Sequence, residues 1–151
     1  MKMILFIFLA AGSVLAQTRS EFRERCESPE IGIYIVRPGI IMSVDFSVDP
    51  LGNDHACEAV IKSQIDETAN ANHKETISSK LAVEIIDELV PEEQRGKVIF
   101  GWQLSAGCNG AQMREYETVE IMRKTRCEAR GGGIYEALIK WKSPWCKYDK
   151  K

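Results

Sequence analysis

The sequence contains few of the residues that usually build a catalytic centre or a metal site. Only two histidines are present, His55 and His73, and no His-Glu-x-x-His or Cys-x-x-Cys motif occurs, so a zinc site would need distant residues. No Gly-x-Ser-x-Gly motif marks a serine nucleophile, and the glycine run 131–133 is not followed by the Gly-Lys-Ser/Thr of a phosphate-binding loop. We therefore expect neither an enzyme nor a protein that carries a cofactor or a metal ion.

Long apolar runs are also absent. A transmembrane helix needs about 20 consecutive apolar residues, whereas the run at residues 3–11 has nine. This run follows Lys2 and precedes Val14-Leu15-Ala16, the arrangement of a secretory signal peptide with small residues before its cleavage site. The sequence thus predicts a signal peptide at residues 1–16, an N-terminal surface arm at 17–30 and a single domain at 31–151. We expect a secreted, extracellular protein without a stable membrane anchor.

Five cysteines follow the predicted cleavage site. They are Cys26, Cys57, Cys108, Cys127 and Cys146. In a small exported protein, cysteines more often form disulfides than bind metals or act as nucleophiles. Because five is an odd number, at least one must be free or pair with another chain.

The first half of the domain predicts two strands and a helix. Residues 31–36 are typical of a short strand, which ends at Arg37-Pro38-Gly39. From Ile40 onward apolar and polar residues alternate, as in a half-buried strand. The apolar face of this strand comprises Met42, Val44, Phe46 and Val48. After a turn at residues 50–53, Asp54 is placed to cap a helix. Helical spacing relates its apolar positions Cys57, Val60, Ile61 and Ile65.

The second half begins with the clearest helix of the chain. Ile77, Leu81, Ile85 and Leu89 recur every four residues, after Thr76 or Ser78 as the cap. Three strands should follow, over residues 97–104, 116–122 and 134–141, with a loop over residues 105–112 after the first. A helix remains an alternative over residues 113–124. The first of these strands is expected to point inward with Val98, Phe100, Trp102 and Leu104. The order ββααβββ predicts an α+β fold, an antiparallel sheet of about five strands with helices packed on one face.

This meander restricts the disulfides. It places Cys108 and Cys146 at one end of the strands and Cys127 at the other, at about 3.3 Å per residue. Bonded cysteines need Cα atoms within about 7 Å, so Cys108–Cys146 is favoured and Cys127 is left for Cys26 or Cys57. Cys57 lies at an apolar helix position that suits a buried thiol. We therefore predict Cys26–Cys127, with Cys57 reduced.

Charge is distributed unevenly along the chain. Residues 17–122 carry 10 basic and 19 acidic residues, a net charge of −9, whereas residues 123–151 carry 9 and 3, a net charge of +6. The basic C-terminal segment 140–151 interleaves five lysines with Trp141, Trp145 and Tyr148. Such a segment suits an acidic glycan, an acidic membrane surface or a protein partner, and nucleic acid is not expected outside the cell. The alternative is that Trp141 belongs to the core, Trp145 covers a disulfide and the lysines keep a tail soluble.

Two short segments resemble loops of the cystatin family. Gln103 begins and Gly107 ends the sequence Gln-Leu-Ser-Ala-Gly, which resembles the Gln-x-Val-x-Gly hairpin of cystatins, and Pro144-Trp145 resembles their Pro-Trp loop. In cystatins these loops and an N-terminal glycine form a wedge that blocks papain-type cysteine proteases. The resemblance implies an inhibitor in which Gln103, Gly107, Pro144 and Trp145 contact the protease. The chain departs from the pattern at Ser105, which replaces the valine, and in having a second predicted helix and no glycine segment before the helix.

The chain as a whole is similar to small excretory–secretory proteins of parasitic nematodes. The similarity lies in the leader FIFLAAGSVLAQ, the small size, and the sequences GWQLSAGC and KTRCEA. The families that it resembles are the secreted clade V proteins and those related to the activation-associated secreted proteins. Their supposed role in host interaction implies a secreted binding protein that acts on a host or tissue protein. Inhibition of a cysteine protease is the alternative function, and glycan binding is a third.

Overall fold

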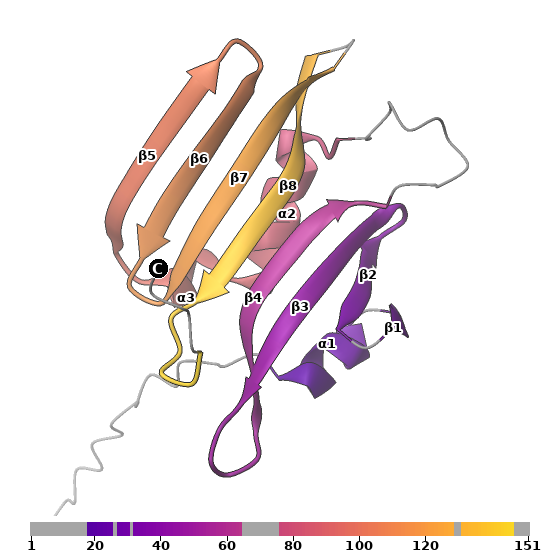
Figure 1. Ribbon diagram of the computed structural model, residues 1–151, viewed down its shortest axis with the longest axis vertical. Coiled ribbons are helices and arrows are strands. Elements are labelled where there is room, and N and C mark those ends of the chain that lie inside the picture. The colour runs from indigo at the N-terminus through magenta and orange to yellow at the C-terminus, as the bar shows by residue number, and fades with distance from the viewer. Residues whose placement is uncertain (1–17, 26, 31, 65–75, 129–130, 147–151) are drawn as a thin grey trace, which may run out of the picture.

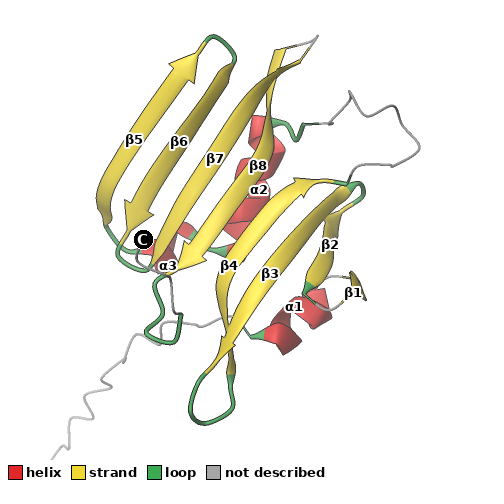
Figure 2. Ribbon diagram, viewed as in Figure 1, coloured by secondary structure: helices red, strands yellow, loops and turns green. Residues whose placement is uncertain are grey.

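One antiparallel sheet with short helices forms the molecule (Figures 1 and 2). The computed structural model describes residues 18–25, 27–30, 32–64, 76–128 and 131–146. The strands, in chain order, are β1 Glu27–Glu30, β2 Ile33–Arg37, β3 Ile40–Val48, β4 Asp54–Ser63, β5 Val98–Ala106, β6 Asn109–Tyr116, β7 Val119–Glu128 and β8 Gly131–Trp141. The helices are α1 Arg19–Arg25, α2 Ser79–Leu89 and α3 Glu92–Arg95. The expected α+β fold with about five strands in the order ββααβββ is therefore wrong.

The sheet consists of two meanders that join in its centre. Its strand order is β1-β2-β3-β4-β8-β7-β6-β5, so β1 to β4 and β5 to β8 each run as consecutive antiparallel neighbours. The pairing of β4 with β8 joins the two halves, and α2 lies behind β8 in the view of Figure 1. None of the helices in the described part of the chain is long and apolar enough to cross a membrane. The predicted signal peptide, residues 1–16, lies outside the described residues.

The core lies between α2 and one face of the sheet. The predicted inward face of β3 is confirmed for Met42 and Val44, which are buried, and Phe46 packs partly buried against the core, whereas Val48 is exposed. The predicted helix is also confirmed, because Ser78 Oγ accepts a hydrogen bond from the Leu81 amide at 3.2 Å and so caps α2. This helix buries Ala82, Ile85, Ile86 and Leu89. The apolar face of α2 and the apolar face of β3 thus both contribute to the same core.

The segment predicted as the first helix is strand β4. Its buried residues are Ala56, Cys57, Ala59 and Ile61. They do not alternate regularly because the register to β3 shifts between Asp45 and Phe46, which leaves Cys57 as an extra residue opposite the partner strand. Such a β-bulge puts two neighbouring residues on the bulged strand opposite one residue of its partner, and in this sequence the result resembles helical spacing.

The described residues of the N-terminal segment form a helix and a short strand. Residues 19–25 form α1 and residues 27–30 form β1. The Phe22 ring is 2% exposed and lies 5.3 Å from the ring of Tyr34 and 5.8 Å from that of Phe46, measured between centroids. One aromatic side chain therefore ties this segment to the core.

The disulfides join Cys57 to Cys146 and Cys108 to Cys127, with Cα–Cα distances of 5.4 and 4.8 Å. The predictions of Cys108–Cys146, of Cys26–Cys127 and of a reduced Cys57 are therefore wrong. The error comes from β6, because residues 109–116, which were predicted partly as a loop, form a strand after a tight turn. One more strand reverses the chain once more, so Cys127 lies at the same end of the sheet as Cys108. Cys26 is the fifth cysteine and lies outside the described residues.

Candidate functional site

On the face of the sheet that carries the core, one row of residues across the strands changes from apolar to polar between β8 and β7. Residues that pair directly across neighbouring strands lie on the same face of a sheet. On the α2 side, one such row begins with Met42 on β3, Ile61 on β4 and Ala137 on β8. The same row continues with Arg123 on β7, Gln112 on β6 and Gln103 on β5. This row is thus apolar from β3 to β8 and polar from β7 to β5, whereas nearer the other end of β7 Val119 and Ile121 still belong to the core.

The polar part of the α2 side forms a small hollow of about 180 Å³. Arg95, Arg114 and Arg123 line it together with Tyr116 and Asp87. The Arg95 guanidinium donates hydrogen bonds to the Val90 carbonyl at 2.8 Å and to the Asp87 carboxylate, and Arg123 donates to the Gln112 side chain. The Arg95 contacts tie α3 to the end of α2. The Arg123–Gln112 contact shows that the β5–β6 hairpin carries polar groups on the α2 side, where core residues would otherwise lie.

The opposite face of the sheet, which we call the open face, carries apolar residues on the strands whose α2 side is polar in that row. Leu138 is only 9% exposed yet lies outside the main core, because its neighbours Ala137 and Ile139 point toward α2. Register pairing links Leu138 to four apolar residues of the strands beside it. We call these five residues the apolar row: Val60 on β4, Leu138 on β8, Met122 on β7, Met113 on β6 and Trp102 on β5. A continuous apolar row therefore crosses five strands on the open face.

Ion pairs flank the apolar row on both sides. Lys140 Nζ lies 3.5 Å from Glu58 Oε2, and Lys142 Nζ lies 2.6 Å from Glu115 Oε1. On the other side of the row, Lys124 pairs with Glu136, and the hydrogen bond to this carboxylate raises the pKa of Lys124 above its ordinary value. Each of these side chains is about one-third exposed. The open face thus has an apolar centre with a charged border.

Strand β5 extends the apolar row at the edge of the sheet. Phe100 and Leu104 alternate with Trp102 on the open face, and they are 53% and 66% exposed. The prediction that this face points inward is wrong, because β5 lies outermost in the strand order and turns Gly101 and Gln103 toward the α2 side. A register shift at Ile99 interrupts the alternation. In Figures 1 and 2, no described helix lies over the near side of β5 to β8.

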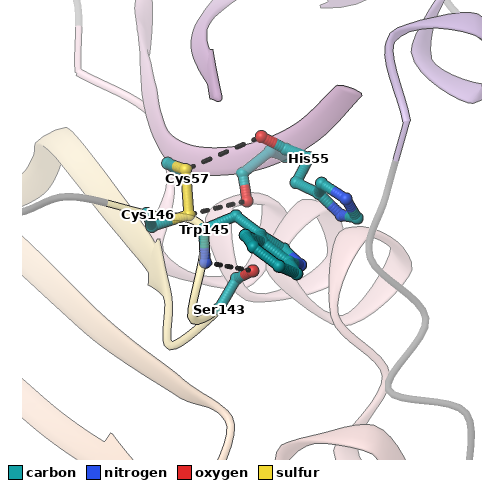
Figure 3. Close-up of a disulfide and its surroundings, with 6 residues drawn as sticks. His55, Cys57, Ser143, Trp145 and Cys146 are labelled. Atoms are coloured by element: carbon teal, nitrogen blue, oxygen red, sulfur yellow. Dashed lines mark hydrogen bonds between the residues drawn. A yellow bond between two sulfur atoms is a disulfide. The ribbon is translucent and has the colours of Figure 1, made fainter. Parts of the chain in front are cut away.

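A second exposed feature lies where Trp145 meets the turn between β3 and β4. The rings of His55 and Trp145 stack with centroids 6.3 Å apart, and the indole is 39% exposed beside the Cys57–Cys146 disulfide (Figure 3). Trp145 thus covers a disulfide, as one sequence interpretation had it, although the bridge is a different one.

Among the described residues, no group of three or more His, Cys, Asp and Glu is placed to hold a metal ion.

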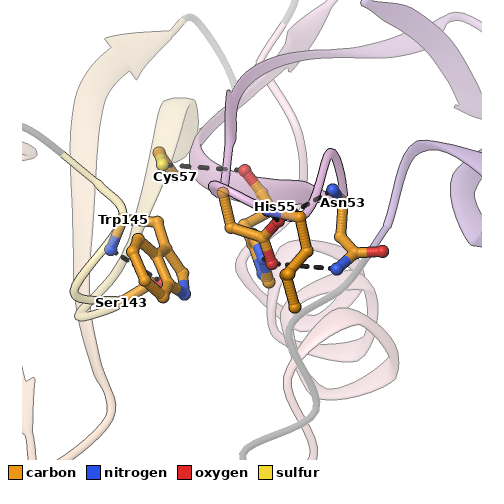
Figure 4. Close-up of polar contacts among 7 residues, drawn as sticks. Asn53, His55, Cys57, Ser143 and Trp145 are labelled. Atoms are coloured by element: carbon orange, nitrogen blue, oxygen red, sulfur yellow. Dashed lines mark hydrogen bonds and ion pairs between the residues drawn. The ribbon is translucent and has the colours of Figure 1, made fainter.

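Hydrogen bonds hold this turn together. His55 Nε2 lies 2.9 Å from Asp49 Oδ2, and Asn53 donates to both oxygens of the same carboxylate, from its backbone and its side chain, at 2.9 Å (Figure 4). The Leu51 amide donates to it at 2.8 Å. Because the hydrogen bonds from His55 and Asn53 stabilise the ionised form, they hold the pKa of Asp49 well below its ordinary value. This network fixes the turn beside Trp145.

Of the residues predicted by the cystatin resemblance, Gln103 lies within β5, and Gly107 lies at the opposite end of the sheet from Trp145. Gly107 forms the turn between β5 and β6, next to Cys108, whose carbonyl oxygen would lie 3.2 Å from a Cβ at Gly132. Gly132 lies near the start of β8, whereas Trp145 follows the end of that strand. Nine residues of strand separate Gly132 from Trp141, which is about 30 Å at 3.3 Å per residue. The structure therefore does not bring Gln103 and Gly107 together with Pro144 and Trp145.

The basic C-terminal segment is divided between the core and the surface. Trp141 is buried with 9% exposure, as the alternative interpretation of this segment expected. Lys140 and Lys142 form the ion pairs with Glu58 and Glu115 described above. Residues 147–151, including Tyr148 and the other lysines, lie outside the described residues.

Sequence patterns missed most of the apolar row. Trp102 was assigned to an inward face, and Met113 and Met122 fell in the region where strand and helix remained alternatives. The sequence signal that pointed to the apolar row is the alternation of residues 134–141, which assigns Leu138 to the face opposite Ala137 and Ile139.

No family model, curated protein or solved structure matches the chain.

Proposed function

We propose that this protein is a secreted binding protein whose open face docks onto an extracellular protein partner. The observation that carries this proposal is the apolar row, which crosses five strands on a face where no described helix lies over β5 to β8 (Figures 1 and 2). Protein–protein interfaces typically have an apolar centre, enriched in aromatic residues and methionine, inside a polar border. The apolar row and its flanking ion pairs have this composition.

The amount of apolar surface also favours a partner. An antiparallel sheet with one face in water normally alternates apolar residues toward the core with polar residues toward solvent. Here the solvent side of β5 carries Phe100, Trp102 and Leu104 in succession, while Gln103 takes the core side. Contiguous exposed apolar residues of this kind mark interaction sites in soluble proteins.

Two features support an extracellular site of action. The chain forms two disulfides, and disulfides persist mainly in oxidising compartments such as the extracellular space. Residues 1–16 have the pattern of a signal peptide. The resemblance to nematode excretory–secretory proteins agrees with a host or tissue protein as the partner.

The two other candidate functions have less support. A cystatin-like wedge needs its two loops side by side, and about 30 Å of strand separates them here. Glycan binding through the C-terminal segment would have to compete with the carboxylates that already pair with Lys140 and Lys142. Titration of papain with the purified protein checks the first of these functions, and we expect no inhibition.

The proposed function can be tested with one substitution on the open face and one matched control. Trp102→Ala removes the largest side chain of the apolar row, whereas Leu51→Ala removes an 87% exposed apolar side chain at the tip of the turn between β3 and β4. The wild-type protein and both variants are screened against an array of extracellular proteins, and the affinity for each partner is measured. We expect Trp102→Ala to weaken binding by about 30-fold, or about 2 kcal/mol, as for an aromatic interface anchor. Binding that depends on Leu51 and not on Trp102 would place the site elsewhere.

A further inference from the structure

The two edges of the sheet differ in their capacity to accept another strand. An edge strand presents unpaired backbone N–H and C=O groups, and proteins usually protect it by short length, proline, charged residues or bulges. Strand β1 at one edge is four residues long and has the sequence Glu-Ser-Pro-Glu, in which the proline lacks an N–H. Strand β5 at the other edge is nine residues long and pairs only with β6 among the described strands.

The sequence of β5 has almost none of these protective features. It reads Val-Ile-Phe-Gly-Trp-Gln-Leu-Ser-Ala, without a charged residue and without proline. The only irregularity is the register shift at Ile99, near one end. The remaining residues, 100–106, pair with β6 in an unbroken register. Strand β5 therefore offers a long, neutral and regular template for pairing.

We infer that two copies of this chain associate through antiparallel pairing of their β5 strands. Because β5 carries no charge, two antiparallel copies meet without repulsion between like charges, which a charged edge would produce. An antiparallel pair of identical strands also has twofold symmetry, the commonest symmetry of protein oligomers. The product is a closed dimer with one continuous sheet of sixteen strands, eight from each copy.

The length of β5 and the faces of its side chains determine the register. Residues opposite each other in a sheet share a face, so a symmetric pairing that keeps both open faces on one side must place a residue opposite itself. Full overlap of Val98–Ala106 puts Trp102 at the twofold axis, and each Phe100 then faces Leu104 of the second copy. Six apolar side chains meet on one face, and they connect the apolar rows of the two copies. Pairing thus covers Phe100 and Leu104, which are 53% and 66% exposed in the single chain.

Charge substitution at β5 tests the association. Leu104→Lys places a charge opposite Phe100 of the second copy, while Leu51→Lys makes the same change at the turn between β3 and β4, where leucine is 87% exposed. Both sites face solvent in the single chain, so both variants should fold as the wild type does. In sedimentation experiments at about 100 µM, where a micromolar Kd leaves most chains dimeric, we expect dimers for wild type and Leu51→Lys and monomers for Leu104→Lys. A monomeric wild type, or a dimeric Leu104→Lys, overturns the inference.

Cross-linking of introduced cysteines tests the register of the β5–β5 pairing independently of how stable the dimer is. In a Cys26→Ser background, Trp102→Cys puts two thiols at the symmetry axis, with Cα atoms about 4.5–5.5 Å apart, which is within disulfide range. Gln103→Cys offsets the two thiols by two residues along the strand, to about 8 Å, which is beyond that range. We expect oxidation to cross-link Trp102→Cys and not Gln103→Cys; equal cross-linking of both, or of neither, overturns the register. The open face of each copy remains available in a monomer, so failure here and failure of the proposed function are separate outcomes.

Discussion

Removal of the Cys57–Cys146 disulfide should destabilise the protein more than removal of Cys108–Cys127. A disulfide restricts the unfolded chain in proportion to the logarithm of the loop that it closes. The sequence separations are 89 and 19 residues, which correspond to about 4.6 and 3.2 kcal/mol in the chain-entropy relation. The pairing therefore predicts a difference of about 1.4 kcal/mol between the two deletions.

Packing should widen this difference. Cys57 is 8% exposed within β4, whereas Cys108 and Cys127 are exposed at the end of the sheet. Replacement of Cys57 by alanine therefore also removes buried contacts, and a buried void adds to the cost. Cys127 lies close to Cys108 even without the bond, because β6 and β7 pair through to Gly110 and Thr125.

Equilibrium unfolding in urea measures both losses. The double variants Cys57→Ala/Cys146→Ala and Cys108→Ala/Cys127→Ala are compared with their parent in a Cys26→Ser background, so that no thiol is left to form a new bridge. Free energies of unfolding come from linear extrapolation, and the slopes report whether the unfolded states differ in compactness. Equal losses, or a larger loss for Cys108–Cys127, would refute either the pairing or the loop-entropy reasoning.

Two further predictions concern the core and the turn between β3 and β4. Ile85→Ala, at a side chain 1% exposed, should lower the free energy of unfolding by about 2–5 kcal/mol. Leu81→Ala, at a partly buried position of the same helix, should lower it by less. Urea unfolding compares the two variants, and equal losses would contradict the packing of α2. Because the hydrogen bonds from His55 and Asn53 lower the pKa of Asp49 in the folded state, the stability that they add is present above pH about 4 and is lost as the pH falls below that value. Thermal unfolding across this range should therefore show a shallower acid loss for Asp49→Asn than for wild type, and parallel profiles would argue against the network.

Sequence periodicity predicted the elements whose pattern nothing interrupts. In α2 the apolar spacing of four residues and the Ser78 cap agree, and both are present in the structure. Strand β3 alternates without a break over residues 40–44, and its inward residues are buried as expected. In both elements the local pattern and the tertiary contacts have the same requirement, so a single sequence is enough to find them.

The errors arose where one residue changes the period. In β4 the bulge at Cys57 places buried residues side by side and makes a strand resemble a helix. Between β5 and β6, Gly107 adopts a φ of 66°, which glycine adopts without steric cost, and closes a turn so short that the surrounding residues are strand. The sequence 105–112 is rich in small residues and was interpreted as a loop. That one missed strand reversed the predicted end for Cys127 and therefore both predicted disulfides.

The outer strands carry polar residues on their α2 side and apolar residues on the open face, and only the first of these two features follows from the fold. A helix of about 10 Å diameter covers two or three strands spaced about 4.8 Å apart, so α2 behind β8 shares the core with Ile121 of β7 and lines a hollow with Tyr116 of β6, but it leaves most of β5 and β6 uncovered. This explains why Gln103, Gln112 and Arg123 occupy the α2 side of the outer strands. It does not explain Trp102, Met113 and Met122 on the open face, because a face in water has no folding requirement for apolar residues. Under the two proposals a second surface would supply that requirement, and Trp102→Ala and Leu104→Lys separate its two sources, a partner on the face and a second copy at the edge.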